Sequence, residues 1–142
     1  MKLIIINGPN INLLGTREPG IYGNENYAAL EKIIRKTCAA ENIEVDIMQS
    51  NHEGVIIDTI QSTAGKYDGI IINPAAFTHT SIAILDALKA VGITTVEVHI
   101  SDISQRESFR QISYAGMACV KTIAGQGIDG YRQAILFLKE YL

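Results

Sequence analysis

The chain has 142 residues, the size of a single domain, and 47% of them are hydrophobic against 19% charged, so a full core can form and wholesale disorder is excluded. The formal net charge is -3 with no block of like charge, which excludes the basic stripe that a nucleic-acid partner requires.

Apolar runs and cysteines indicate where the protein resides. The longest apolar runs are a handful of residues, too short to cross a membrane, and the run at residues 3–6 is too short for a signal peptide. Cys38 and Cys119 are isolated, without CxxC spacing, which is typical of a reducing compartment. We therefore expect a soluble cytoplasmic protein with neither a membrane nor a nucleic-acid partner.

Short apolar, β-branched runs alternate along the chain with segments of helical periodicity. In chain order, strands are predicted at residues 3–6, 43–48, 69–72, 94–98 and 119–123, and helices at 27–40, 55–64, 80–91 and 131–141. Most strand runs are continuous, which is typical of strands covered on both faces. The pattern predicts an α/β, flavodoxin-like three-layer sandwich around a five-stranded parallel sheet of order 2-1-3-4-5.

One connection is long for a βα loop. It covers about residues 8–24, and long ordered loops in compact domains are usually functional. We expect it to be a lid over a site, with a plain structural Ω-loop as the alternative. No linker or repeat interrupts the sequence, so residues 1–142 are expected to form a single catalytic domain.

Polar residues follow the predicted strands, where open parallel sheets bind ligands. They are Asn7, Asn10, Asn12, Arg17 and Tyr22 after the first strand, Asn51, His52 and Glu53 after the second, Asn73, Thr78, His79, Thr80 and Ser81 after the third, and His99, Ile100 and Ser101 after the fourth. Each alone could be a helix cap or turn residue. Two histidines beyond strand ends, beside Asn, Arg and Tyr, favour a site.

Several kinds of site are disfavoured. Asn7 and Asn73 stand where a receiver domain needs carboxylates for magnesium, and no phosphate-binding GxxxxGK[ST] occurs. The GxGxxG at residues 125–130 follows the last strand, so a tight turn with close strand–helix approach is the favoured interpretation. The three histidines lack zinc spacing, no GxSxG nucleophile motif occurs, and no metal or cofactor is expected.

Proton transfer is the remaining chemistry. His99 can act as an acid or base, and Glu97, two residues earlier on the same strand face, could orient its ring; a surface charge is the alternative for Glu97. Tyr22 is a candidate base, provided that Arg17 and Arg106 lower the pKa of its phenol from about 10.

These residues resemble those of the type II 3-dehydroquinate dehydratases along essentially the whole chain. The matching blocks are NGPNINLLG (7–15), REP (17–19), YG (22–23), SNHEG (50–54), INP (72–74), THTS (78–81), EVHIS (97–101), RE (106–107) and FR (109–110). The resemblance implies a lyase of the shikimate pathway, leading to chorismate and the aromatic amino acids. It would dehydrate 3-dehydroquinate to 3-dehydroshikimate by anti elimination through an enolate.

The resemblance also implies roles for individual residues. Tyr22 would be the base that removes the C2 proton, with Arg17 and Arg106 holding it as the phenolate. Asn10 would position a water on the developing oxyanion. His99, with Glu97 behind it, would protonate the departing C1 hydroxyl. The substrate-binding residues would be Asn73, His79, Ile100, Ser101 and Arg110, with Asp86 reaching in from a neighbouring subunit. No cofactor, metal or Schiff-base lysine is implied, and trimers would assemble into a dodecamer.

Five positions depart from the family's usual pattern. Ala75 replaces a common Gly, Phe77 a Tyr, Leu85 an Arg, Asp102 an Asn and Ser104 a His. Asp102 is expected to weaken substrate affinity through its charge, and Leu85 to alter a subunit contact. Two other hypotheses remain: a non-catalytic flavodoxin-like module that binds a flavin or nucleotide, and a homologue that has lost catalysis. The first loop lacks the Ser/Thr/Gly cradle of the former, and intact Arg17, Tyr22 and His99 disfavour the latter.

Overall fold

A single parallel sheet organises the part of the chain that the computed structural model describes, residues 1–16 and 25–142. Its strand order is β2-β1-β3-β4-β5, which confirms the predicted topology. The strands are β1 (Lys2–Asn7), β2 (Glu44–Gln49), β3 (Gly69–Asn73), β4 (Thr94–His99) and β5 (Lys121–Ala124).

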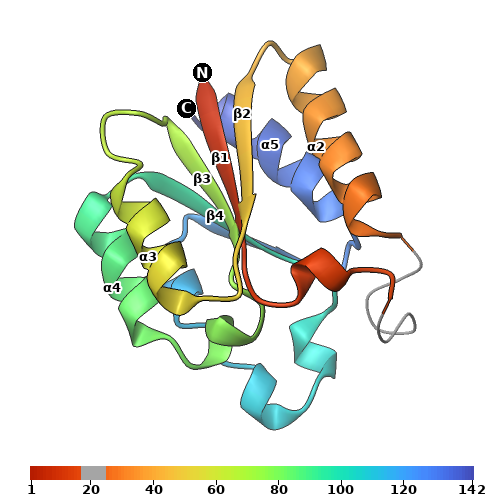
Figure 1. The fold of residues 1–142 in the computed structure, drawn as a ribbon, viewed down its shortest axis with the longest axis vertical. Helices are drawn as coiled ribbons and strands as arrows, with labels where there is room; N and C mark the ends of the chain where they lie inside the picture. Colours follow the sequence, from red (N-terminus) through yellow and green to blue (C-terminus); the bar gives the residue numbers. More distant parts are fainter. Residues whose placement is uncertain (17–24) are drawn as a thin grey trace.

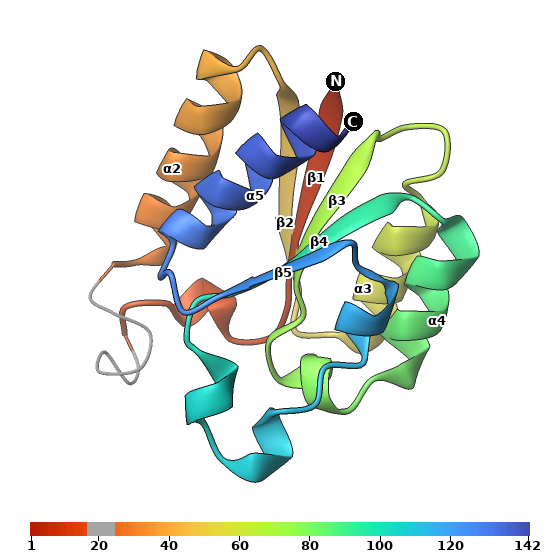
Figure 2. The same cartoon turned by 180° about the vertical axis from the view of Figure 1, so that it is seen from behind.

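Two helices cover each face of the sheet (Figures 1 and 2). On one face lie α2 (Tyr27–Ala40) and α5 (Asp129–Tyr141), and on the other lie α3 (Glu53–Gln61) and α4 (Ile82–Val91). Ser81 caps α4, because its Oγ accepts a 3.0 Å hydrogen bond from the backbone N–H of Ile84. The helix therefore begins two residues after the predicted start.

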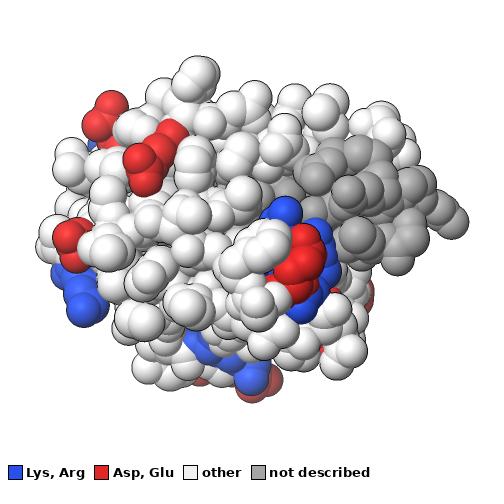
Figure 3. Space-filling model, turned by 90° about the horizontal axis from the view of Figure 1, so that it is seen from below, with Lys and Arg blue, Asp and Glu red and all other residues white. Residues whose placement is uncertain are grey.

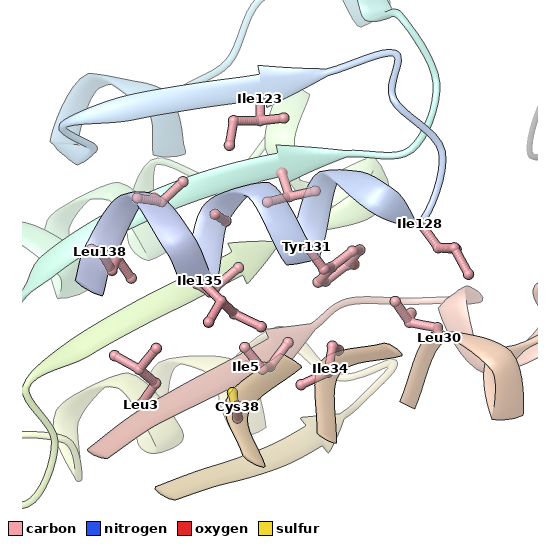
Figure 4. Close-up of a cluster of buried hydrophobic side chains, with 14 of the residues drawn as sticks. Leu3, Ile5, Leu30, Ile34, Cys38, Ile123, Ile128, Tyr131, Ile135 and Leu138 are labelled. Carbon is pink, nitrogen blue, oxygen red and sulfur yellow. The ribbon is translucent and has the colours of Figure 1, made fainter. Parts of the chain in front are cut away.

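The continuous apolar strands are explained by cores on both faces. Successive strand residues point to opposite faces, so Leu3 and Ile5 pack toward α2 and α5, whereas Ile4 and Ile6 pack toward α3 and α4. Figure 4 shows the first of these cores, in which Tyr131 of α5 is the largest fully buried side chain.

Within residues 1–16 and 25–142, five short 3-10 helices occur that were not predicted from the sequence. They are η1 (Ile11–Leu13), η2 (Ala75–His79), η3 (Ile103–Gln105), η4 (Ser108–Arg110) and η5 (Ala115–Ala118). The last of them corrects the predicted start of the fifth strand. Cys119 ends η5, where its N–H donates to the carbonyl of Gly116, so β5 begins only at Lys121 and the expectation that Cys119 lies inside a strand is wrong.

All strand carboxyl ends point to one end of the molecule, and both termini lie at the opposite end (Figure 1). The expected lid, residues 8–24, begins at the carboxyl end of β1 and contains η1, while residues 17–24 lie outside the described residues. In residues 1–16 and 25–142, no helix is long and apolar enough to cross a membrane.

Candidate active site

A cavity of about 170 Å³ lies where the strands end. Four parts of the chain line this cavity: the turn after β1 with η1, the end of β3 with η2, the end of β4, and the segment that carries η3 and η4. The predicted site residues that line it are Asn10, Asn73, His79, His99, Ile100, Ser101, Arg106 and Arg110.

Two predicted site residues in the described part of the chain do not line this cavity. Glu97 is fully buried behind His99, and Asp86 lies exposed on α4. Arg17 and Tyr22 lie outside the described residues. The apolar lining residues were assigned no role from the sequence; they are Pro9, Ile11, Leu14, Ala75, Ala76 and Ile103.

Two side chains at the end of β4, His99 and Glu97, form a close buried contact. Nε2 of His99 lies 2.9 Å from Oε2 of Glu97, and the two side chains are 5% and 1% exposed. The strand places both side chains on one face, as residues i and i+2. The alternative that Glu97 is a surface charge is therefore wrong. Because Nε2 faces the carboxylate, Nδ1 is the ring nitrogen that can act on a molecule in the cavity.

Two hydroxyl groups complete the surroundings of the Glu97 carboxylate. Thr122 Oγ1 donates to Oε1 at 2.8 Å, and Ser113 Oγ donates to Oε2. Burial opposes the charged form of Glu97, but the contacts with His99, Ser113 and Thr122 outweigh it, and the pKa of Glu97 lies below its usual value. Glu97 is thus a buried anion beside the ring of His99.

His79 presents one ring nitrogen to the cavity. Nδ1 lies 2.8 Å from the carbonyl oxygen of Ile112, which only accepts, so Nδ1 carries the hydrogen and donates it. Burial lowers the pKa of His79, and the charges of His99 and Arg110 act in the same direction, against the Ile112 bond and Glu97. In the neutral ring, Nε2 is an acceptor suited to a hydroxyl group.

The side chain of Asn73 is hydrogen-bonded to a residue of the hydrophobic core. Its Nδ2 donates to the phenolic oxygen of Tyr131 at 3.0 Å, and that hydroxyl donates to Oδ1 of Asn7 at 2.7 Å. Asn7 and Asn73 are paired across β1 and β3, which explains why one phenol on α5 reaches both. Oδ1 of Asn73 accepts from the N–H of Ala75 at 3.1 Å. The helical periodicity of residues 131–141 indicated only that Tyr131 lies on a helix.

Asn10 occupies a turn that a neighbouring connection holds. Its φ of 69° is left-handed, a conformation that Asn adopts more readily than most residues. Its backbone N–H donates to Oδ1 of Asn51 at 3.0 Å. Gln49 Nε2 donates both to that oxygen, at 3.1 Å, and to the carbonyl of Gly8, at 3.0 Å. Asn51, a candidate helix cap in the sequence, instead holds the turn after β1.

Two arginines make one wall of the cavity basic. Arg106 Nη1 donates to Oγ of Ser101 at 3.3 Å, and its side chain is 13% exposed. Arg110 lies 3.3 Å from the exposed Glu107, which also lies 3.6 Å from Arg106. Figure 3 views this end of the molecule, where basic and acidic groups lie together on a mostly uncharged face. A carboxylate ligand would gain from this wall.

The described residues, 1–16 and 25–142, contain no group of three His, Cys, Asp or Glu side chains that could hold a metal ion.

The glycines that follow β5 form the tight turn that was predicted there. Gly125 and Gly127 have φ of 78° and 61°, and a Cβ on Gly130 would lie 3.2 Å from Val98, so the close-approach interpretation is confirmed.

Comparison with known proteins decides the family. The family model described as dehydroquinase class II matches residues 1–139. The chain belongs to this family. The class II dehydroquinase family was expected from the sequence blocks, and that prediction is confirmed.

Individual relatives of this class II dehydroquinase agree over nearly the whole chain. The 3-dehydroquinate dehydratase of Clostridium acetobutylicum is 51% identical over 142 residues, covering 100% of this chain and 99% of its own. That of Endomicrobium trichonymphae is 52% identical over 134 residues, 94% of each chain. The crystal structure of type II dehydroquinase from Butyrivibrio crossotus DSM 2876 superimposes with a TM-score of 0.96 at 53% identity, covering 98% of this chain and 97% of that one.

Two departures from the class II dehydroquinase pattern interact with each other. Asp102 Oδ1 accepts hydrogen bonds from both the N–H and the hydroxyl of Ser104, at 3.0 and 2.6 Å, and so caps η3. Asp102 is exposed and does not line the cavity. This geometry does not support the expectation that its charge weakens substrate binding.

Two further departures concern packing and backbone. Ala75, at the position where the pattern favours Gly, has a left-handed φ of 54°, which explains the preference for Gly. Leu85 is 7% exposed, so its side chain packs within its own subunit and little of it is available for the expected subunit contact. Phe77 is half-buried in the core beside α3 and α4.

Proposed function

We propose that this class II dehydroquinase removes water from 3-dehydroquinate to give 3-dehydroshikimate, as a lyase of the shikimate pathway. The observation that carries the proposal is the buried His99–Glu97 pair in the wall of a small polar cavity at the carboxyl end of the sheet. Such a pair supplies a protonated acid to a bound hydroxyl group. The relatives named above carry the same activity in their names.

The first step is removal of the C2 proton. The family resemblance assigns the base to Tyr22, with Arg17 and Arg106 favouring its phenolate. The C–H electron pair then forms an enolate with the C3 carbonyl. Asn10 lines the cavity, and its turn is held by Asn51. In the proposal, Asn10 positions a water that hydrogen-bonds the enolate oxygen where negative charge develops.

The second step is loss of the C1 hydroxyl. The enolate collapses, the electron pair forms the C1–C2 double bond, and the C1–O bond breaks. His99 gives its proton to the departing oxygen, so water leaves and neutral imidazole remains. Glu97 favours the protonated ring before the step because its charge lies 2.9 Å from Nε2. Base and acid act from opposite faces of the substrate ring, which is anti elimination.

Substrate binding is assigned to the remaining cavity residues. Asn73, Ser101 and the backbone N–H of Ile100 would hold the substrate carboxylate and the hydroxyl beside it. His79 and Arg110 would contact the ring hydroxyls. The acceptor Nε2 of neutral His79 and the donors of Arg110 suit those groups. No cofactor has a part in this reaction scheme, and residues 1–142 would act as one catalytic domain.

Besides its substrate, the protein would bind other copies of itself, as trimers that assemble into a dodecamer. Large apolar side chains are exposed on α4, η4 and η5 and their flanks; they are Ile82, Phe109, Ile112 and Met117. Asp86 is exposed on α4 and lies outside its own cavity, so a role at a site would require a neighbouring subunit. We further propose a cytoplasmic location, which the free thiols Cys38 and Cys119 support.

Turnover of purified protein tests the function. Given 3-dehydroquinate with a chelator and no nucleotide, the protein should produce the ultraviolet absorbance of a conjugated enone. The non-catalytic alternative predicts no turnover and tight binding of a flavin or nucleotide. Borohydride added with substrate should leave activity intact, because no imine forms with a lysine. Inactivation by borohydride would contradict the proposed chemistry.

A further inference from the structure

Three groups besides His99 enclose the carboxylate of Glu97. The hydroxyl of Ser113 donates to Oε2, the hydroxyl of Thr122 donates to Oε1 at 2.8 Å, and the backbone of Gly116 packs against Oε1. A Cβ on Gly116 would lie 2.8 Å from Oε1 and 2.9 Å from Ser113 Oγ. The carboxylate therefore has neither space to turn nor an oxygen without a donor or ion-pair partner.

The fold fixes both donors. Thr122 lies directly opposite Glu97 in the register of β4 and β5, so the two side chains share one face of the sheet. Ser113 Oγ accepts a 2.9 Å hydrogen bond from the N–H of Gly116, and its own hydrogen is thus left to donate to Glu97.

The segment that carries Ser113 is hydrogen-bonded to η2 through the two residues that flank Ser113, Ile112 and Tyr114. Ile112 accepts from Nδ1 of His79, and the N–H of Tyr114 donates to the carbonyl of Thr78 at 2.9 Å. Three consecutive residues thus hold η2 and Glu97 together. Such a segment can fix the relative positions of the two histidines.

We propose that Ser113 and Thr122 are positioning residues for His99, acting through Glu97. They hold the carboxylate in one orientation and stabilise its negative charge, so that the ring keeps its place and its proton remains on the imidazole rather than moving to Glu97. The proposal rests on the proposed function for its kinetic consequence, but the geometry of the pair is independent of the substrate.

The charged and titratable groups around the pair come from several elements. His79 of η2 interacts with both members of the pair, Arg106 and Arg110 line the cavity that His99 also lines, and Cys119 lies near Glu97 at the end of η5. None of them donates a hydrogen bond to the carboxylate among the described residues, so the two hydroxyls are the donors that substitution can remove.

Removal of either hydroxyl is expected to raise the pH at which the His99–Glu97 pair loses its proton. A proton leaves the pair from His99 and leaves Glu97 as a buried anion without its counter-ion. With one donor fewer, that state is less stable, so the pair releases its proton at higher pH and is a weaker acid. The acid step then becomes slower.

The experiment compares Ser113→Ala and Thr122→Val with the hydroxyl-retaining variants Ser113→Thr and Thr122→Ser. We expect each of the first two to lower kcat on the order of 10-fold, with KM within about 2-fold, and to move the alkaline limb of the kcat profile to higher pH. The hydroxyl-retaining variants should recover most of the activity. Thr63→Val, which removes a buried hydroxyl that donates to the carbonyl of Ile60 within α3 and its flank, is the matched control.

A second readout needs no turnover. The ring nitrogens of His99 are followed by nitrogen NMR against pH in the free protein, with His52→Gln and His79→Gln used to assign the signals. The proposal predicts that Ser113→Ala and Thr122→Val move the His99 transition to higher pH, whereas Thr63→Val does not. An unchanged transition and an unchanged kcat profile would overturn the proposal. Absent turnover in the wild type with a shifted transition would overturn the proposed function alone.

Discussion

The side-chain amide of Asn73 donates a 3.0 Å hydrogen bond to the phenolic oxygen of Tyr131, which is wholly buried on α5. Burial raises the pKa of Tyr131, so its hydroxyl stays protonated and donates onward to Asn7. A residue of the cavity wall therefore depends for its orientation on a helix in the core behind it.

Substitution of Tyr131 by Phe should affect both stability and substrate binding. Asn7 and Asn73 each lose a buried partner, which costs about 2 kcal/mol in the free energy of unfolding. Because the amide of Asn73 is then held only through Oδ1 by the N–H of Ala75, it is less well oriented, and KM should rise more than kcat falls. Denaturant unfolding and steady-state kinetics measure the two effects. Tyr67→Phe is the control, since its hydroxyl bonds Asp46 away from the cavity; equal kinetic effects in both variants would refute the role.

Ala75→Gly should stabilise the protein. A left-handed residue other than Gly costs about 1–2 kcal/mol, and the extra chain entropy of Gly offsets about 0.5–1 kcal/mol of that gain. The expected net change is therefore a rise of about 0.5 kcal/mol in the free energy of unfolding. Ala76→Gly, at a neighbouring position without positive φ, should instead lower stability. A loss in both variants would show that φ at position 75 carries no strain.

Asp102→Asn should change substrate affinity little. The side chain is exposed and bonded to Ser104, and an amide oxygen can still accept both hydrogen bonds. We expect KM within about 2-fold of the wild type at physiological ionic strength, where exposed charges are screened. Arg110→Gln, a change of one charge in the cavity wall, should raise KM clearly more. A large fall in KM for Asp102→Asn would restore the original expectation that this charge weakens binding.

Glu97 should contribute to stability in a pH-dependent way. Its pKa in the folded protein lies below its usual 4.5, so its contribution is fully present above about pH 4.5 and is lost as pH falls through the lower, folded value. The stability advantage of the wild type over Glu97→Gln should therefore shrink below about pH 4.5. Unfolding measured in a pH series checks this. Glu44→Gln, at an exposed position on β2, should show no comparable trend.

The topology could be predicted because apolar runs and helical periods alternate without interruption. The continuous apolar runs at residues 3–6 and 69–72 fit strands that are covered on both faces, and the structure has a hydrophobic core on each face of these strands. The 3-10 helices could not be predicted, since they depend on local hydrogen bonds such as that from Ser104 to Asp102 rather than on a periodic pattern.

The site could be predicted in part for a similar reason. Residues directly after strands, such as Asn73, meet at one sheet edge whatever the details of the loops. Thr122 and Tyr131 reach the site through strand register and helix packing, which no local motif reveals. Ser113 lies in a segment without regular periodicity, so its contact with Glu97 had no sequence signal.

The central claim is that one group removes the C2 proton and His99 separately releases the C1 hydroxyl. It is tested most directly by exchange of the C2 hydrogen of 3-dehydroquinate in deuterium oxide, followed by proton NMR with His99→Gln and Tyr22→Phe. The account predicts that His99→Gln still exchanges the C2 hydrogen while dehydration stops, and that Tyr22→Phe does neither. Exchange that persists in Tyr22→Phe, or dehydration that persists in His99→Gln, would contradict it.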